Sequence, residues 1–366
     1  MKPRLLNAIG VGICLIGLLA WPQSGWSQGS TVGQRLKDRL AQRQPANAES
    51  ANGIDVQLAL IKPGEYRFNF QHDGLNRMYR VHLPASYKPA TPVPLLFALH
   101  GGGGNMELQA DDAKYGLISK SEQQGFVVVF PNGHSKLPGG KLATWNAGNC
   151  CAAARDAQVD DVGFIREVLT RVTQQVNVDY KRIYATGMSN GAMMAYRLAC
   201  EMSEVFSGIA AVAGTDNTRS CEPEMPVSVL HIHAKNDRHV LFNGGAGPDS
   251  VRASQVTDYV SVANTIVKWT KKSACGLPPK RTLDTPAAFC QVYAPCSGGS
   301  EVQLCVTETG GHSWPGGEKG RGNEPPSQAI SAVDVMWDFF NRIKPPVPQT
   351  QPMTPASAPA PSSQSK

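Results

Sequence analysis

The sequence predicts an α/β fold in which a mostly parallel β-sheet is covered by helices on both faces. Between about residues 64 and 343, short continuous apolar runs alternate with segments whose apolar residues recur at helical spacing. Apolar residues form 41% of the 366-residue chain, which is enough for a sizeable core and excludes a wholly disordered protein. Strand–helix alternation of this kind is typical of a parallel sheet with helices packed on it.

The elements follow one another in a regular order. Strands are expected at residues 78–83, 95–99, 126–130, 182–186, 208–213, 227–233 and 304–307. Helices are expected at residues 162–176, 192–200, 256–271 and 328–343. Pro84 ends the first strand, because proline cannot continue a ladder of hydrogen bonds. Asp160 and Asp161 lie at the start of the first helix, where carboxylates accept hydrogen bonds from unpaired N–H groups.

The first residues are typical of an export signal. Lys2 and Arg4 precede an apolar run at 5–20, and the small residues Gly25 and Ser27 follow, which predicts cleavage after residue 27. An uncleaved membrane anchor is the alternative, although the run is shorter than the ~20 residues of a spanning helix. We therefore expect a secreted protein, periplasmic or extracellular, with no stable membrane insertion after cleavage.

The rest of the chain divides into three parts. Residues 28–63 form a polar N-terminal segment, and residues 64–343 contain nearly all the strong apolar patterns. Residues 344–366 are rich in Pro, Gln, Ser and Ala and are expected to form a disordered tail, because they cannot bury a core.

Charge and cysteine usage exclude two classes of partner. The formal net charge is +6, two of the positive residues lie in the predicted signal, and no stretch concentrates Lys and Arg as a nucleic-acid-binding surface would. Eight cysteines follow the signal, and an even number favours disulfides in an exported protein. Their spacings do not match those of zinc sites, so no metal is expected.

The pairing of these cysteines is open, since eight cysteines allow 105 arrangements. Proximity of the predicted elements favours Cys200 with Cys221, Cys275 with Cys296, and Cys290 with Cys305. Elimination then leaves Cys150 and Cys151 for each other.

One motif at a strand-to-helix junction predicts the chemistry. Residues 187–191 read G-M-S-N-G, directly after the strand that ends at Thr186 and at the start of the next helix. Such a turn exposes the Ser189 hydroxyl above the strand ends, and flanking glycines remove Cβ atoms that would collide there. The N–H groups of the following helix point to the same place. The alternative is a glycine-flanked strand end at which the serine only caps the helix.

A second motif, H-G-G-G-G at 100–104, follows the predicted strand 95–99. Loops of this type supply one N–H group of an oxyanion hole, and the residue after the nucleophile supplies another. The expected donors are the backbone N–H groups of Gly101 or Gly102 and of Asn190. The alternative is a flexible glycine loop without a ligand.

A serine nucleophile needs a histidine base and an acid. With a G-x-S-x-G motif, the chain order is serine, then the acid, then the histidine. His312 lies in a glycine-rich loop after the last strand, and Asp237 follows the strand 227–233. We therefore expect His312 as the base and Asp237 as the acid. The rival acids are Asp249 and Asp258. The rival histidines are His231 and His233, which are expected to be structural, and His239, which is close in sequence to Asp237.

Five motifs together resemble the exported esterases of the polyhydroxybutyrate depolymerase and feruloyl esterase family. They are H-G-G-G-G-N (100–105), T-W-N-A-G-N-C-C (144–151), V-D-D-V-G-F (159–164), G-M-S-N-G (187–191) and G-H-S-W-P-G-G (311–317). The resemblance covers about residues 67–341 and implies an α/β-hydrolase fold with a triad of Ser189, Asp237 and His312. Two positions depart from the family pattern, because Ala234 and Ala152 stand where glycine is usual.

The implied activity is hydrolysis of carboxylic esters through an acyl-serine, with no cofactor. The expected substrates are feruloyl or short-chain esters of plant polysaccharide, and polyhydroxyalkanoate polyesters are the alternative. A serine peptidase of the same fold or a non-catalytic binding protein would belong to another class. Trp145 and Trp314 are expected to border the acyl pocket, unless both rings only pack the bases of their loops. No aromatic residue follows Phe340, so we expect weak attack on crystalline polyester, which needs a surface-binding platform.

Overall fold

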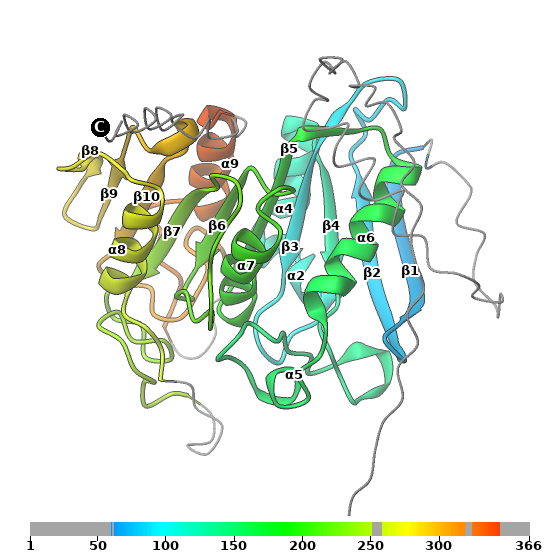
Figure 1. Ribbon diagram of the computed structural model, residues 1–366, viewed down its shortest axis with the longest axis horizontal. Coiled ribbons are helices and arrows are strands. Elements are labelled where there is room, and N and C mark those ends of the chain that lie inside the picture. Colours follow the sequence, from blue (N-terminus) through cyan, green and yellow to red (C-terminus); the bar gives the residue numbers. More distant parts are fainter. Residues whose placement is uncertain (1–59, 61, 251–257, 319–323, 345–366) are drawn as a thin grey trace, which may run out of the picture.

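A ten-stranded sheet runs through the computed structural model, which describes residues 60, 62–250, 258–318 and 324–344. The strand order is β1-β2-β4-β3-β5-β6-β7-β10-β9-β8 (Figure 1). The six strands from β4 to β10 in this order are parallel, and the outer strands are antiparallel. The bounds are β1 Gly64–His72, β2 Leu75–Leu83, β3 Val93–Leu99, β4 Val127–Pro131, β5 Val178–Met188, β6 Gly208–Val212, β7 Ser228–Ala234, β8 Lys280–Asp284, β9 Ala288–Tyr293 and β10 Val302–Thr307.

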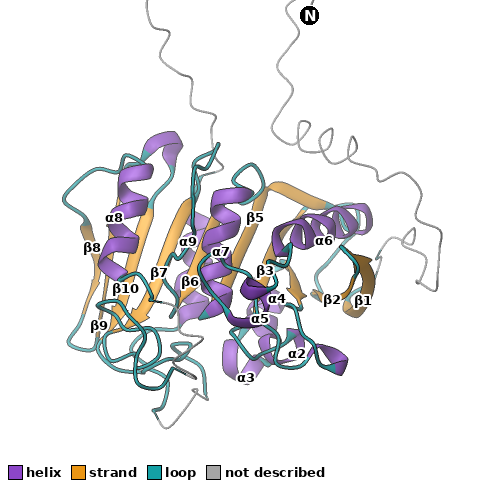
Figure 2. Ribbon diagram, turned by 60° about the horizontal axis from the view of Figure 1, so that its bottom comes forward, coloured by secondary structure: helices purple, strands orange, loops and turns teal. Residues whose placement is uncertain are grey.

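Helices cover both faces of this sheet (Figures 1 and 2). One face carries α6 (Asp161–Gln175), α7 (Asn190–Glu201) and α8 (Val262–Lys272), and the other carries α4 (Leu117–Gln124) and α9 (Ala332–Arg342). Shorter helices lie in the connections: α2 (Met106–Gln109), α3 (Asp112–Tyr115) and α5 (Ala152–Asp156). The prediction of a mostly parallel sheet between two layers of helices is confirmed.

The central strands are apolar throughout because both of their faces are buried. In β3, Leu95, Phe97 and Leu99 belong to the core under α6 and α7, whereas Leu96 and Ala98 belong to the core under α4 and α9. Successive side chains of a strand point to opposite faces, so a strand between two cores needs an apolar residue at every position.

Two helices begin later than their apolar patterns predict. The expected helices at 256–271 and 328–343 begin at Val262 and Ala332. The serine before each helix, Ser261 or Ser331, accepts a hydrogen bond from the backbone N–H group three residues on, as an N-cap does. The described apolar residues before each cap therefore belong to loops and not to the helices. Residues 251–257 lie outside the described part of the chain.

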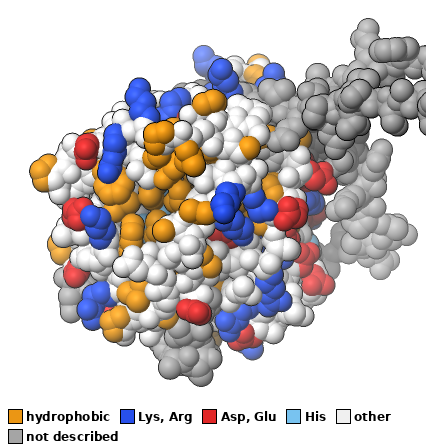
Figure 3. Space-filling model, turned by 60° about the vertical axis from the view of Figure 1, so that its left-hand side comes forward, with side chains coloured by type: hydrophobic (Ala, Val, Ile, Leu, Met, Phe, Trp, Pro, Cys, Tyr) orange, Lys and Arg blue, Asp and Glu red, His pale blue; other side chains and the backbone are white. Residues whose placement is uncertain are grey.

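Strands β1, β8 and β9, which extend the sheet at its two edges, were not predicted from the sequence. β8 is largely exposed and contributes Lys280 and Arg281, charged residues of the kind that discourage pairing with another chain. Figure 3 looks onto this side of the molecule, where apolar side chains gather in one area with lysines and arginines around it. Among the large apolar side chains on the described surface, Leu277 is the most exposed, at 73%.

Four disulfides tie neighbouring elements together. They join Cys150 to Cys151, Cys200 to Cys221, Cys275 to Cys296, and Cys290 to Cys305. No described helix is both long and apolar enough to cross a bilayer. The predicted export signal and most of the predicted tail lie outside the described residues.

Candidate active site

Ser189 lies at a sharp turn between β5 and α7. Its φ of 57° is in the left-handed region, which residues other than glycine rarely adopt. The turn is crowded: a Cβ atom on Gly191 would lie 2.1 Å from the Leu99 carbonyl oxygen, and one on Gly187 would lie 2.5 Å from Gly191. A Cβ atom on Gly214 would lie 2.3 Å from the Ser189 carbonyl oxygen. The surrounding backbone therefore holds the serine in a strained conformation of the kind found at reactive sites.

The loop after β3 approaches this serine closely. A Cβ atom on Gly101 would lie 3.5 Å from the Ser189 Cβ atom. Gly103 N–H donates to Ala143 and Gly104 N–H donates to Gly101. These two bonds shape the loop. Gly101 and Gly102 are the loop residues beside the nucleophile turn, since a Cβ atom on Gly102 would lie 3.5 Å from the Asn190 Cβ atom. Asn190 N–H belongs to the first turn of α7, where backbone donors have no partner within the helix.

His100 holds this loop from inside the protein. Its Nε2 atom accepts from Gly133 N–H at 2.9 Å, so its Nδ1–H group donates to the Gly101 carbonyl oxygen at 2.8 Å. Burial lowers the pKa of His100 to about 4, although the bond to Gly101 acts in the opposite direction. The imidazole is therefore neutral near pH 7, and it anchors the glycine loop rather than carrying charge.

Trp145 does not lie where the sequence analysis expected it. Its ring is fully buried against His100, and its indole N–H group donates to the His100 carbonyl oxygen at 2.9 Å. The Asn190 side chain accepts from Trp145 N–H at 2.7 Å and donates to its carbonyl oxygen at 3.0 Å. In this structure the Trp145 ring packs inside the base of the loop, and the Asn190 side chain holds its backbone in place.

Asp237 and His312 come together at the ends of β7 and β10. His312 Nδ1–H donates to Asp237 Oδ2 at 2.8 Å, and Asp237 Oδ1 accepts from the backbone N–H groups of His239 and Val240. Burial alone would raise the pKa of Asp237, but hydrogen bonds from His233 and His312 hold it well below its usual range. The carboxylate can only accept, so it orients His312 with its Nε2 atom as the basic nitrogen.

Ser189 shares no hydrogen bond with the Asp237–His312 pair in the described part of the chain. His312 Nε2 is buried and forms no hydrogen bond with any described residue. Ser189 is partly exposed and lines a cavity together with Ser313 and Trp314, the two residues after His312. In proteins without bound substrate, catalytic hydrogen bonds are often long and tighten only in the complex.

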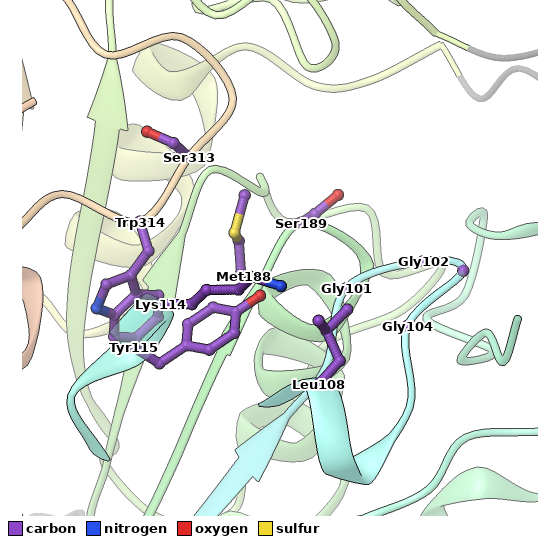
Figure 4. Close-up of a pocket in the computed structure, with 11 residues that line it drawn as sticks. Gly101, Gly102, Gly104, Leu108, Lys114, Tyr115, Met188, Ser189, Ser313 and Trp314 are labelled. Atoms are coloured by element: carbon purple, nitrogen blue, oxygen red, sulfur yellow. The ribbon is translucent and has the colours of Figure 1, made fainter. Parts of the chain in front are cut away.

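The cavity beside Ser189 has a volume of about 190 Å³ and both apolar and polar walls (Figure 4). Met188, Leu108 and the rings of Tyr115 and Trp314 form much of its wall. Those two rings pack edge to face with centroids 5.4 Å apart. Lys114 from α3 also lines the cavity, and Figure 4 shows its side chain extending beside that of Tyr115. Trp314 therefore lines this cavity, whereas Trp145 does not.

The rival residues lie elsewhere or have other partners. Asp249 is at the surface in an ion pair with Arg238, and the His239 ring stacks on His312 with centroids 4.8 Å apart. His231 and His233 are buried in β7, but His233 Nε2 lies only 3.3 Å from Asp237 Oδ2. This contact was not predicted from the sequence, although the i, i+4 spacing of the two residues across the strand end could have indicated it.

Within the described residues, one group has metal-ligand types in close range: Cys200, Asp216 and Cys221. Its two sulfur atoms form a disulfide, so they are not available as thiolate ligands.

Comparison with known proteins identifies relatives of this chain. A protein-family model described as "Putative esterase" matches residues 74–276, more than half of the chain. Feruloyl esterase B of Piromyces equi is 31% identical over 249 residues, which cover 66% of this chain and 43% of that enzyme. Feruloyl esterase C of Emericella nidulans is 29% identical over 270 residues, covering 72% of this chain and 83% of the enzyme. This chain therefore matches less than half of the length of the Piromyces protein.

The solved structures agree in fold. The acetyl xylan esterase of Aspergillus awamori superposes with a TM-score of 0.50 and 14% identity, covering 75% of this chain and 99% of that enzyme. At this identity the likeness establishes the α/β-hydrolase fold.

Proposed function

This chain belongs to the family described as "Putative esterase", and we propose that it hydrolyses carboxylic esters through an acyl-serine intermediate. Ser189 is the nucleophile, His312 the general base and Asp237 the acid that orients it. The observation that carries the proposal is the Asp237–His312 bond at 2.8 Å, placed beside the cavity on which the strained Ser189 opens.

Each step uses a group already described. His312 Nε2 takes the Ser189 proton as the oxygen attacks the ester carbonyl carbon, and the carbonyl electrons move to the oxygen. The N–H groups of Gly101 or Gly102 and Asn190 stabilise this oxyanion, and losing one such donor typically costs ~10²–10³ in rate. The carbonyl then reforms, and the alcohol leaves with the proton from His312. Water, deprotonated by the same nitrogen, releases the acid and restores Ser189.

The proposed substrates are soluble feruloyl-type and short-chain esters of plant polysaccharide. The names of the relatives support this class. The aromatic walls of the cavity, Tyr115 and Trp314, suit a flat aromatic acyl group, since aromatic pairs prefer offset or edge-to-face packing. Polyhydroxyalkanoate is the second candidate. Secretion is part of the same proposal and rests on the predicted signal and the four disulfides.

A nucleophile exchange tests the activity. The wild type should hydrolyse p-nitrophenyl acetate and methyl ferulate, and Ser189→Ala should lower kcat by up to ~10⁶-fold, as in other serine triads. His312→Ala should cost a similar factor, and the double variant should add little, because the two groups act as a unit. Ser207→Ala is the matched control, since Ser207 is buried and donates to Lys181 away from the cavity.

Two outcomes would contradict the proposal. Near wild-type turnover by Ser189→Ala would exclude the acyl-serine mechanism. Rapid clearing of crystalline polyhydroxybutyrate without any release of ferulate from methyl ferulate would favour the polyester substrate over the proposed one.

A further inference from the structure

Behind Asp237 lies a buried chain of hydrogen-bonding groups that the acyl-transfer steps do not use. Tyr196 Oη lies 2.8 Å from His231 Nδ1, and His231 Nε2 lies 3.2 Å from His233 Nδ1. His233 Nε2 lies 2.9 Å from the Val240 carbonyl oxygen and 3.3 Å from Asp237 Oδ2. Tyr196, His231, His233 and Asp237 are at most 2% exposed. We call Tyr196, His231 and His233 the inner relay.

The partners of the relay determine which atom carries each proton. The Val240 carbonyl and the Asp237 carboxylate can only accept, so His233 Nε2 must carry hydrogen. When His233 is neutral, its Nδ1 atom accepts and His231 Nε2–H donates to it. His231 Nδ1 then accepts from the Tyr196 hydroxyl. Every hydrogen bond of the relay therefore runs in one direction, from Tyr196 towards Asp237.

Burial supports this assignment of protons. It raises the pKa of Tyr196 well above its usual value, so the phenol stays protonated and can donate. Burial, together with the neighbouring His233, lowers the pKa of His231 well below its usual value, so His231 is neutral and carries one ring proton. The reverse direction would turn His231 Nδ1–H towards Tyr196, and the phenol hydrogen would then lose its acceptor at His231.

We propose that His233 is a positioning residue for the acid–base pair: its Nε2–H group holds the Asp237 carboxylate towards His312, and Tyr196 and His231 fix the tautomer that makes this bond. Tyr196 lies on α7, the helix that begins directly after Ser189. The relay thus connects the helix of the nucleophile to the loop of the acid. The role rests on the proposed function, because positioning has meaning only if His312 acts as a base.

The charged and titratable groups around this pair come from several elements. The His239 ring stacks on His312, and Tyr259 is close enough for the charge of Asp237 to raise its pKa, after burial as the main cause. On the far side, the Glu324 carboxylate lies 2.7 Å from where a Cβ atom on Gly311 would stand, and it accepts from Asn236. His233 differs from these groups in its position, because its Nε2 atom, 2.9 Å from the Val240 carbonyl oxygen, also lies 3.3 Å from the Asp237 oxygen that accepts from His312.

The sign of the pH effect follows from the shared oxygen. A donor on Asp237 Oδ2 withdraws electron density from the bond to His312, so it makes the carboxylate a weaker partner for the imidazolium. Removal of that donor strengthens the hold on the imidazolium, so less acid is needed to protonate the base. We expect the midpoint of the acidic limb of the kcat/KM profile to move to higher pH in a variant without the donor.

Four variants test the role by kcat/KM for p-nitrophenyl acetate across pH. His233→Leu should shift the acidic limb upward by roughly half a unit to one unit and lower the plateau about tenfold. His233→Gln should recover most of both, because the glutamine amide nitrogen stands as many bonds from Cα as imidazole Nε2. Tyr196→Phe should cost roughly threefold, since it removes the bond that fixes the tautomer. Tyr184→Phe is the matched control, a buried tyrosine whose hydroxyl donates to Phe340.

A second measurement uses the wild-type protein and does not depend on activity. Nitrogen-15 NMR of the histidine-labelled wild-type protein distinguishes the two neutral tautomers of each ring. The proposal requires Nε2–H tautomers at His231 and His233. An Nδ1–H tautomer at either residue would overturn it, as would an unchanged acidic limb in a folded His233→Leu variant. If the wild type hydrolyses no ester, the proposed function fails, and the NMR spectrum still decides the proton assignment.

Discussion

Replacement of Gly191 by alanine should inactivate the protein while most of the fold survives. A Cβ atom at this position would lie 2.1 Å from the Leu99 carbonyl oxygen and 2.6 Å from the His100 carbonyl oxygen. Both are backbone atoms, and real Cβ atoms essentially never approach other atoms within 3.0 Å. The end of β3 and the first turn of α7 must therefore separate by about 1 Å, which moves the glycine loop away from Ser189.

Two opposing effects of this substitution can be compared. Alanine favours a helix over glycine by ~1 kcal/mol, whereas an extra methyl group in a packed site costs ~1–3 kcal/mol. The net loss of stability should therefore be small, at most ~2 kcal/mol. Catalysis is more sensitive, because a misplacement of 1 Å between reacting groups can cost ~10²-fold. We expect a loss of at least that size in kcat/KM with a change in melting temperature of only a few degrees.

The assay compares kcat/KM for p-nitrophenyl acetate with the thermal melting of the same samples. Gly276→Ala is the matched control, because a Cβ atom there would meet its nearest neighbour, the Ala294 carbonyl oxygen, at an ordinary 3.4 Å. A Gly191→Ala protein within threefold of wild-type activity would contradict this prediction, because it would show that activity tolerates separation of the glycine loop from Ser189.

Three further predictions concern stability. Burial lowers the pKa of His100 from 6.5 to about 4, so the unfolded chain takes up this proton at a higher pH than the folded protein. The free energy of unfolding should therefore fall by up to ~3 kcal/mol as the pH drops from about 6.5 to about 4. Urea titrations at pH 7 and pH 4.5 measure this loss. Arg77→Met should cost ~3–5 kcal/mol in the same titration, because it leaves the fully buried Asp161 carboxylate without the guanidinium 2.6 Å away, and Arg77→Met with Asp161→Leu should recover much of this loss. Replacing both Cys200 and Cys221 by serine opens a loop with a sequence separation of 21 and should cost ~3 kcal/mol without loss of activity at 25 °C, whereas an unchanged melting temperature would show that this bridge does not stabilise the fold.

Much of the site could be predicted because its signals are local. A serine between two glycines at a strand-to-helix junction, and four glycines after an apolar strand, are patterns that the chain displays within a few residues. The structure shows why the pattern at Gly191 is needed, since the carbonyl oxygens of β3 leave no space for a side chain. Helix α6, predicted at 162–176 and found at Asp161–Gln175, was predictable for the same reason, because its apolar spacing is a property of one continuous segment.

The parts that were missed depend on contacts between distant segments. Trp145 and Asn190 are 45 residues apart, and nothing near either residue indicates that the amide clamps the tryptophan backbone. His233 reads as an ordinary polar residue in an apolar strand, since its partner Asp237 becomes visible only when the strand end curls back. The starts of α8 and α9 depend on a serine cap that an apolar pattern does not include.

The order of strands explains how residues far apart in the chain meet at one edge of the sheet. The glycine loop follows β3, Ser189 follows β5, Asp237 follows β7 and His312 follows β10, and these strands are parallel. The carboxyl ends of parallel strands lie on one side, where ligands of open α/β sheets bind.

The bond between Asp237 and His312 depends on the register of the last parallel pair. β7 and β10 pair from Val229 with Val302 to Ala234 with Thr307, so both strands end level and their loops start side by side. A shift of one residue would turn every side chain of β10 to the opposite face, including the buried Cys305. Cys305 forms a disulfide with Cys290, which lies directly opposite on β9. The shift would therefore have to break this disulfide or move β9 together with β10. The bridge therefore restrains the strand that precedes His312, the proposed base, and so helps to fix the register of β10.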